Sequence, residues 1–456
     1  MDGSQYDVII MGTGITESVL SGLLSMEGRK VLHVDSNPFY GDSGASLNIT
    51  SLFKKFKPNE EIPQELGANR DWNVDLIPKY VMAYGKLVKL IIKTKVSDYL
   101  TWKCVEGTYV YQYSNGGFFS SAGGKIEKVP SNDKEALSSN LMSLFEKRRC
   151  QKFFKYVQNF DINKPETHKK LNPKAPFEAF MEYFELESNT IDFIGHAIAL
   201  YESDTYRKLP ALEVISKIQL YMESVGRFGE SPFIYPVYGL AGIPESFSRK
   251  CAVHGGTFML NVQINALEND KEKNLTTLKG EFEGVAGTAK APIVIGNPSY
   301  FSKLSNDSLI KKISKTIRVI CILDHPIENT GKSNACQIII PQKQTGRNSD
   351  IYIMCLGSEH GVCKKGYYIA ILSTTLEKSV EEDLKLAFQI IGPVKYKFIT
   401  EEELCKPIEG KAPEGWFITD TLDPTSHFES AAENVIEIYQ KITGKKIDLN
   451  IEQENN

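Results

Sequence analysis

The sequence predicts an α/β protein in which a larger domain of the dinucleotide-binding type is interrupted by a small α-helical domain. Residues 6–35 follow the order strand, glycine turn, helix, strand and acid, which is the βαβ start of a dinucleotide-binding fold. Residues 130–225 show the apolar spacing of helices, whereas β-branched runs resume after that segment. We therefore expect a larger domain made of residues 1–129 and 226–456, and an inserted helical domain made of residues 130–225.

The first βαβ unit begins with a short β-branched run at residues 6–11, which is typical of a buried parallel strand. The turn Gly12-Thr-Gly-Ile-Thr-Glu17 follows, and the apolar residues after it have helical spacing. Gly28 ends that helix, and residues 30–34 form the second predicted strand, which Asp35 closes.

The glycine turn departs from the dinucleotide-binding pattern at its third position, where Glu17 replaces a glycine. A carboxylate in the first helical turn favours the helix but repels a phosphate, because both occupy the positive end of the helix. Asp35 is compatible with two roles, an acceptor for a ribose hydroxyl or a solvated acid at the strand end. We therefore expect the fold to be kept and the cofactor to be lost.

Composition and charge exclude several classes of protein. The 456 residues, 41% of them hydrophobic, are enough for a large core and two or three domains. The net charge of −4 argues against a nucleic-acid-binding surface, and no apolar run approaches the roughly 20 residues that span a bilayer. We expect no signal peptide, because the N-terminus leads directly into the first strand. The 8 cysteines include no CxxC pair, which indicates reduced thiols in a cytosolic protein, and no motif indicates a metal or catalytic site.

The predicted larger domain continues through segments of mixed character. Residues 43–70 are polar and irregular, and a helix is expected through residues 81–91. Residues 109–111 and 125–129 alternate like the strands of a hairpin whose loop is lengthened by glycines.

Apolar stripes at helical spacing define the predicted helical domain. They run through Leu137, Leu141, Leu144 and Phe145; Phe153, Phe154, Val157 and Phe160; Phe177, Phe180, Met181 and Phe184; Ile191, Ile194, Ile198 and Tyr201; and Ile215, Ile218 and Met222. Gly195, Ala197 and Ala199 lie along the fourth stripe. Small residues there are explained by close helix packing, which is the default interpretation, or by a slot for an apolar ligand such as a lipid chain.

Strands return after residue 227. They are expected at residues 255–260, 291–295, 318–323, 337–340, 351–354 and 367–372. The first two are expected to extend the first sheet, and the last four to form an antiparallel series. Helices are expected at residues 243–249 and 427–442.

The chain resembles the Rab GDP-dissociation inhibitor family over nearly its whole length. The matching blocks are Tyr6-Asp-Val-Ile, Gly12-Thr-Gly-Ile-Thr-Glu17, Leu20-Ser-Gly22, Asn37-Pro-Phe-Tyr-Gly41, Asp71-Trp-Asn-Val-Asp-Leu-Ile-Pro78, Asn140-Leu-Met, Phe145-Glu-Lys-Arg-Arg149, Gly195-His-Ala, Ser231-Pro, Tyr238-Gly-Leu, Gly255-Gly-Thr and Ser426-His-Phe-Glu429. The resemblance rests on blocks in a fixed order along the chain, and not on the glycine turn alone.

The resemblance implies a flavoprotein-like FAD/NAD(P)-binding fold that has lost its flavin, in agreement with Glu17. It further implies a regulatory carrier without enzymatic activity. Members of the family bind GDP-bound, prenylated Rab GTPases, slow GDP release and mask the geranylgeranyl groups, which recycles the GTPase between membrane and cytosol in vesicle transport. We therefore expect a monomeric cytoplasmic protein with transient membrane recruitment and with no cofactor, metal or nucleic acid.

The resemblance also assigns candidate residues. The GTPase-contacting face is expected to include Tyr40, Arg70, Arg249, Thr257 and Met259, although the residues alone also allow Tyr40 to pack locally in its loop. A mobile loop implicated in membrane recruitment matches Arg227, Phe228, Gly229, Glu230 and Ser231. The prenyl chain is expected in the helical domain, at Met142, Phe145, Ile194 and Ala197.

The chain departs from the family pattern near these positions. Ala241 and Gly242 stand where the family places Gly-Glu, so a carboxylate of the GTPase-contacting face is absent. Gly41-Asp42 stands for a glycine pair, Glu230 replaces a lysine, and the loop at residues 112–123 is longer than in the family.

Glu245 offers a substitute for the missing carboxylate. If residues 243–249 are helical, Glu245 and Arg249 are four residues apart on one face, in the favourable order for an ion pair. Glu245 is then expected either to hold Arg249 ready for the GTPase, or only to complement the positive N-terminus of the helix.

Two other functions are weighed against this one. A Rab escort protein, which presents Rab to a prenyltransferase, belongs to the same family, but those chains are longer. A flavin-dependent oxidoreductase is disfavoured by Glu17 and by the absence of a Gly-Asp flavin signature near the C-terminus. A pull-down of prenyltransferase distinguishes the first alternative, and the visible spectrum of the purified protein distinguishes the second.

Overall fold

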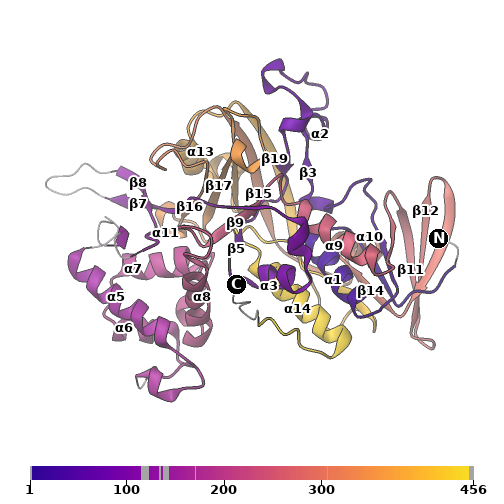
Figure 1. The fold of residues 1–456 in the computed structure, drawn as a ribbon, viewed down its shortest axis with the longest axis horizontal. Helices are drawn as coiled ribbons and strands as arrows, with labels where there is room; N and C mark the ends of the chain where they lie inside the picture. The colour runs from indigo at the N-terminus through magenta and orange to yellow at the C-terminus, as the bar shows by residue number, and fades with distance from the viewer. Residues whose placement is uncertain are drawn as a thin grey trace.

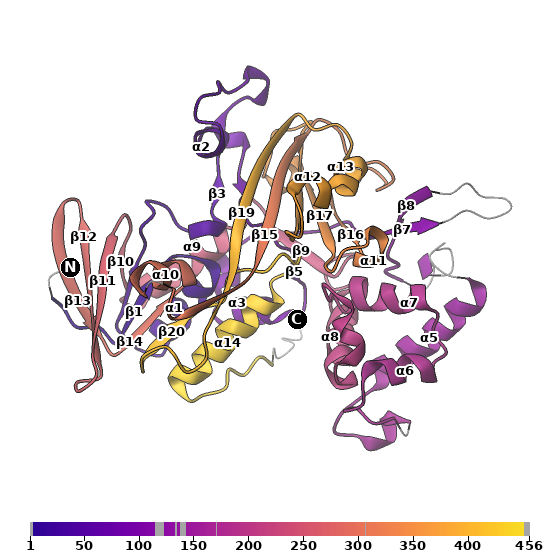
Figure 2. The same cartoon turned by 180° about the vertical axis from the view of Figure 1, so that it is seen from behind.

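The computed structural model describes residues 3–114, 123–132, 135–136, 143–169, 171–305 and 307–450. Figures 1 and 2 show three regions. Small sheets with their helices lie at one end, a long mixed sheet rises in the middle, and the magenta helices of the chain's second quarter gather at the other end.

The first sheet has five parallel strands in the order β10-β2-β1-β14-β20. Their bounds are β1 Val8–Met11, β2 Val31–Val34, β10 Thr257–Met259, β14 Ile293–Gly296 and β20 Trp416–Ile418. Helix α1 Ile15–Met26 joins β1 to β2 and packs against α9 Gly242–Val253 and α14 Glu429–Thr443. The predicted βαβ start, the two later strands of this sheet and both later helices are confirmed.

A three-stranded antiparallel sheet packs beside the parallel sheet. Its strands are β11 Gln263–Asp270, β12 Leu275–Phe282 and β13 Val285–Ala291. These strands are absent from the sequence prediction, because threonine, alanine and glycine carry much of their pattern and few large apolar side chains alternate along them.

The central sheet has seven strands in the order β19-β15-β18-β17-β16-β7-β8. Their bounds are β7 Gly107–Ser114, β8 Gly123–Lys128, β15 Ile310–Leu323, β16 Ala335–Ile340, β17 Ile351–Gly357, β18 Tyr368–Thr375 and β19 Tyr396–Pro407. All neighbours are antiparallel except β7 and β16, which are parallel. The predicted antiparallel series and the predicted hairpin are confirmed, whereas the half-exposed edge strand β19 is missing from the prediction.

Among the described residues, the main elements of the helical region are α-helices and a π-helical segment. Their bounds are α5 Leu144–Asn159, α6 Phe177–Tyr183, α7 Ser188–Phe193, the π-helical segment Ile194–Ile198 and α8 Ala211–Ser224. The helical character of these stripes is confirmed, with Leu144 and the second stripe on one continuous helix, α5. Leu137 and Leu141 lie outside the described residues. One buried apolar cluster joins these helices to the parallel and central sheets.

Of two expectations about the segment before the helical region, the first is wrong and the second is confirmed only from Lys86 onward. Within residues 43–70 the chain forms α2 Ile49–Phe56, because Asn48 caps its N-terminus by accepting a hydrogen bond from the Ser51 amide at 2.8 Å. The helix expected through residues 81–91 is divided into strand β5 Val81–Met82 and helix α3 Lys86–Lys93.

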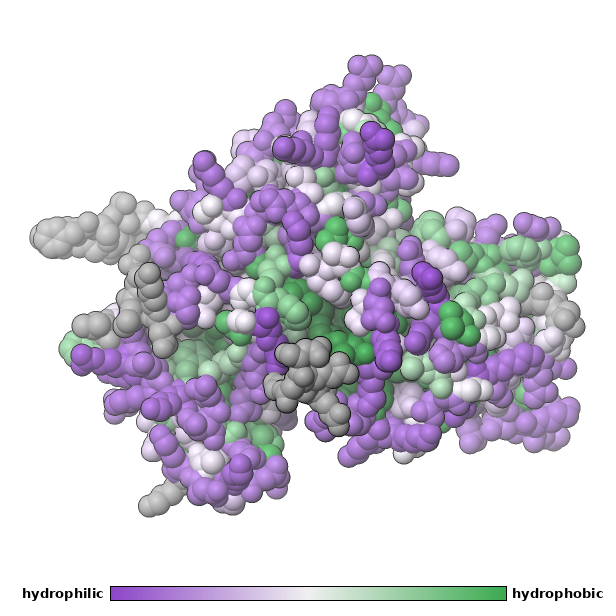
Figure 3. Space-filling model, viewed as in Figure 1, coloured by the Kyte–Doolittle hydropathy of each residue, from purple (hydrophilic) through white to green (hydrophobic). Residues whose placement is uncertain are grey.

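The remaining elements are short. They are β3 Ser46–Leu47, β4 Val74–Asp75, β6 Trp102–Cys104, β9 Phe233–Pro236, α10 Pro298–Ser305, α11 Gln342–Thr345, α12 Val380–Asp383 and α13 Lys385–Ile391. Within the described ranges, no helix combines the length and the hydropathy that crossing a membrane requires. Figure 3 shows a largely hydrophilic face with an apolar hollow at its centre, beside the helical region.

Candidate functional site

Asp35, at the end of β2, fixes the glycine turn through hydrogen bonds. Its Oδ2 accepts hydrogen bonds from the amide and the hydroxyl of Thr13, at 2.7 and 2.5 Å, and its Oδ1 accepts from the Asn37 amide at 2.7 Å. The side chain is fully buried. The solvated alternative for Asp35 is therefore wrong, and both carboxylate oxygens are used inside the protein rather than offered to a ribose.

Glu17 occupies the space in front of the glycine turn. Its side chain is 3% exposed, and its Oε1 accepts a hydrogen bond from the Thr419 hydroxyl at 2.6 Å. Its Oε2 lies 2.6 Å from the point where a Cβ on Gly14 would stand. Burial raises the pKa of Glu17 to about 7, against the lowering effect of the Thr419 hydrogen bond. Charge repulsion of a phosphate is therefore weaker than expected near neutral pH, and the carboxyl group acts mainly by filling the turn.

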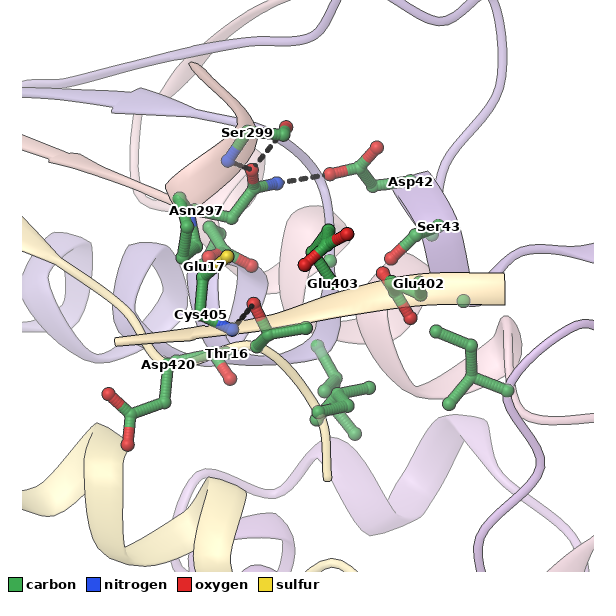
Figure 4. A pocket seen from close by; sticks show the side chains of 18 of the residues that line it. Thr16, Glu17, Asp42, Ser43, Asn297, Ser299, Glu402, Glu403, Cys405 and Asp420 are labelled. Carbon is green, nitrogen blue, oxygen red and sulfur yellow. Dashed lines mark hydrogen bonds between the residues drawn. The ribbon is translucent and has the colours of Figure 1, made fainter. Parts of the chain in front are cut away.

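A cavity of about 360 Å³ lies beyond Glu17, next to the carboxyl ends of β1 and β14. Figure 4 shows Glu17, Asp42 and Asn297 on its wall with Glu402 and Glu403 of β19. The Asn297 side-chain amide donates to Asp42, and burial raises the pKa of Asp42 to about 6. In the doubly wound fold this is where a dinucleotide would bind.

The residues of this cavity do not fit a flavin dinucleotide. A pyrophosphate needs free backbone amides and a glycine at the third position of the turn, but Glu17 covers that turn. The Asp42 carboxyl adds a second acid to the wall of the cavity.

Four predicted GTPase-contacting residues come from neighbouring elements. Tyr40 is half-buried, with its ring centroid 6.2 Å from that of Phe258 on β10, the strand that also carries Thr257 and Met259. Burial raises the pKa of Tyr40, and the charge of the exposed Glu245 on α9 raises it further. The structure thus brings Tyr40, Glu245 and β10 together, and Tyr40 combines local packing with partial exposure.

Arg249 does not pair with Glu245. Its guanidinium carbon lies 4.7 Å from the ring centroid of Tyr99, and among the described residues no ion pair joins it to Glu245. The expected pair is wrong, because the planar guanidinium stacks on an aromatic face across from α9 instead. Glu245 lies in the first turn of α9, as the helix-complementing alternative requires.

Arg70 and Gly242 lie on separate elements. Arg70 stands on a 3₁₀ turn with its side chain 89% exposed, 4.0 Å from Asp71. Gly242 begins α9, and a Cβ there would lie 3.3 Å from Leu100 Cδ2. A side chain at this position would require the end of the Leu100 side chain to shift by a few tenths of an ångström.

The predicted loop at residues 227–231 lies against the larger domain. The Arg227 guanidinium stacks 3.8 Å from the Tyr84 ring centroid, and the thiol of Cys104 donates to the Phe228 carbonyl at 2.5 Å. Phe228 and Glu230 are exposed, and Glu230 lies 3.4 Å from Lys128. Gly229 is half-buried, while Ser231 is buried.

The predicted prenyl-binding residues that the structure describes differ in their exposure. Ile194 and Ala197 are fully buried, Phe145 is 71% exposed on α5, and Met142 lies outside the described residues. The small residues of the π-helical segment are covered by Tyr206, because a Cβ on Gly195 would overlap its ring. Close packing, the default interpretation of these small residues, is what the structure shows.

A buried histidine that the motifs did not single out joins the helical region to the central sheet. His196 Nδ1 lies 2.7 Å from Asp350 Oδ2, just before β17, and His196 Nε2 lies 3.1 Å from Asp204 Oδ1. These two carboxylates raise the pKa of His196 to about 9, although burial alone would lower it. The protonated imidazole therefore donates to both. The block Gly195-His-Ala contained this residue, but its partner is 154 positions away.

The same cluster could be taken for a metal site, since ligand atoms of Asp192, His196 and Asp204 lie within 4.8 Å of one another. Arg207 lies 2.6 Å from Asp192, and Lys343 lies 2.8 Å from it. These cations already neutralise the carboxylates, so the arrangement is an ion-pair network.

The fold is shared with oxidoreductases. A solved oxidoreductase structure from Methanosarcina mazei superposes with a TM-score of 0.60 at 13% identity, covering 95% of this chain and 100% of that one. At this identity the likeness concerns the fold alone.

The family follows from closer matches. The family model for GDP dissociation inhibitors matches residues 1–454. Rab GDP dissociation inhibitor beta from Canis lupus familiaris is 44% identical over 449 residues, which is 98% of this chain and 96% of that protein. The crystal structure of Rab GDI from Plasmodium falciparum has a TM-score of 0.92 at 46% identity and covers 98% of this chain and 100% of that one. The chain belongs to the GDP dissociation inhibitor family.

Proposed function

We propose that this protein is a non-enzymatic regulator that binds GDP-bound, prenylated Rab GTPases, slows their release of GDP and masks the prenyl groups. Family membership over residues 1–454 is the observation that carries this proposal. The blocked glycine turn agrees with it, because a carrier of this kind needs no flavin. The protein is proposed to act in the cytoplasm as a monomer, with transient recruitment to membranes.

The GTPase is proposed to bind where Tyr40, Thr257, Met259, Glu245 and Arg249 gather. Tyr40 lies against β10, and Arg249 is held in place by the Tyr99 ring while its side chain stays exposed. An arginine fixed in this way loses little conformational freedom when it binds a carbonyl or carboxylate of the partner. Arg70 extends this face, and the loop at residues 227–231 is proposed to contact the membrane.

The lipid is proposed to bind in an inserted domain of residues 130–225. Each buried methylene contributes about 0.8 kcal/mol, so even partial burial of a long chain adds much affinity. Since Tyr206 covers Gly195 and since Ile194 and Ala197 are buried, binding between these helices requires the Tyr206 ring to move.

The proposal is tested by the rate at which labelled GDP leaves prenylated Rab. We expect the protein to slow this release. Arg249→Ala is expected to weaken the effect, so that about tenfold more protein is needed for the same inhibition, because an exposed arginine at the contact is lost. Lys271→Ala removes an exposed positive charge from the distant β11–β12 turn and is expected to change nothing. An unaltered GDP release rate with the native protein would contradict the proposal.

A further inference from the structure

Tyr238 is the most exposed tyrosine among the large apolar side chains of the described residues, at 70%. It stands between β9 and α9 with a φ of +73°. A bulky side chain with positive φ is a strained outlier, and such strain persists only where the surroundings impose it. The chain therefore holds an aromatic ring in water at a cost to its own stability.

The surroundings of Tyr238 impose this geometry. Its amide donates to the His360 carbonyl at 2.8 Å, and the next residue, Gly239, also has a positive φ. The ring lies against Gly361, where a Cβ would come within 2.6 Å of Tyr238 Cδ1. Gly361 leaves the space that the Tyr238 ring needs. The position of this ring therefore depends on two chain segments that are far apart in sequence.

Hydrogen bonds join the surroundings of Tyr238 to two segments that adjoin residues of the proposed GTPase-binding face. Asn73 lies three residues after Arg70, and its side-chain amide donates to the Gly361 carbonyl at 2.9 Å. Thr101 lies two residues after Tyr99, on whose ring the Arg249 guanidinium stacks, and the Thr101 carbonyl accepts a hydrogen bond from the Val237 amide at 2.8 Å. The chain around Tyr238 thus contacts the segment that follows Arg70 and the segment that follows Tyr99.

We infer that Tyr238 is an aromatic anchor of this face, which the GDP-bound GTPase covers in the complex. The inference rests on the proposed function. A tyrosine ring supplies apolar area with few rotatable bonds, and its hydroxyl supplies one hydrogen bond at the tip. Because the backbone fixes the ring before binding, little conformational freedom is lost on association.

The test exchanges Tyr238 for glycine, which adopts positive φ without strain. Tyr238→Gly is expected to leave the unfolding midpoint unchanged or higher, while the affinity for GDP-loaded Rab falls at least tenfold, equally for prenylated and unprenylated Rab. Tyr238→Ala removes the ring but keeps the strained backbone. It is therefore expected to lose the same Rab affinity as Tyr238→Gly and to have a lower unfolding midpoint than that variant. Glu283→Gly, at an exposed positive-φ position in the β12–β13 turn, is the matched control and is expected to bind normally.

The outcomes separate this inference from the function on which it rests. If the native protein does not bind GDP-loaded Rab, the proposed function fails. If the native protein binds and Tyr238→Gly binds equally well, the function stands and the anchor is overturned. If Tyr238→Gly keeps its Rab affinity but loses binding to anionic liposomes, Tyr238 contacts a membrane and this inference is likewise wrong.

Discussion

Asp350→Ala is expected to lower the free energy of unfolding by about 3–5 kcal/mol, because the buried charge of His196 loses the nearer of its two carboxylate partners. Asp350 and His196 are both fully buried, and their side chains lie 2.7 Å apart. Asp350 Oδ1 also accepts a hydrogen bond from the Gln342 amide at 2.8 Å, which the variant leaves unsatisfied. Equilibrium unfolding in urea measures the change.

Glu437→Ala is the matched control for this variant. It removes one partner of an exposed ion pair, 2.6 Å long, between Glu437 and Lys441 on α14, and is expected to change stability by less than about 0.5 kcal/mol. A loss below about 1 kcal/mol for Asp350→Ala would contradict the account of the buried pair.

The His196 pair also gives the protein a defined pH dependence. The pKa of His196 is about 9 in the folded protein, whereas that of an unperturbed histidine is 6.5. A group with a raised folded pKa contributes its full stability below the unfolded value, and this contribution is lost as pH rises through the folded value. The free energy of unfolding is therefore expected to fall between pH 6.5 and 9, and to fall less in Asp350→Ala.

Gly195→Ala is expected to destabilise the protein by about 1–3 kcal/mol or more, because the new methyl group overlaps the Tyr206 ring. That ring cannot easily move, since its hydroxyl donates to the Ile191 carbonyl at 3.1 Å and the ring packs against the His196 ring in a T-shaped arrangement.

Gly44→Ala is the control for Gly195→Ala, because no atom lies within 4 Å of the methyl group added at residue 44. We expect its stability to match that of the native protein within about 0.5 kcal/mol. A double-mutant cycle with Tyr206→Leu isolates the overlap, since removing the ring should relieve much of the cost of Gly195→Ala. Additive losses would show that the cost arises elsewhere.

The sequence predicted the secondary-structure elements whose apolar spacing is evident within a short stretch of residues. The βαβ start, the antiparallel series and the helical stripes follow from spacing along neighbouring residues, and the structure confirms them. The prediction missed β11–β13, because small residues with few alternating large apolar side chains do not distinguish a strand from a loop.

The site was less predictable because its interactions join distant residues. The spacing of Glu245 and Arg249 suggested a pair, but spacing does not reveal that Tyr99 offers Arg249 an aromatic face. The sequence alone indicates that Glu17 stands where the dinucleotide-binding pattern has a glycine. Its protonation, however, depends on burial beside Thr419, which is 402 positions away.

The central claim is that this chain recognises GDP-bound, prenylated Rab, and extraction from membranes tests it most directly. Liposomes carrying prenylated Rab, loaded with GDP or with a non-hydrolysable GTP analogue, are mixed with the purified protein and sedimented. We expect Rab to move into the supernatant as a complex when it carries GDP and to stay with the liposomes when it carries the GTP analogue. Equal extraction in both nucleotide states, or none in either, would contradict the account.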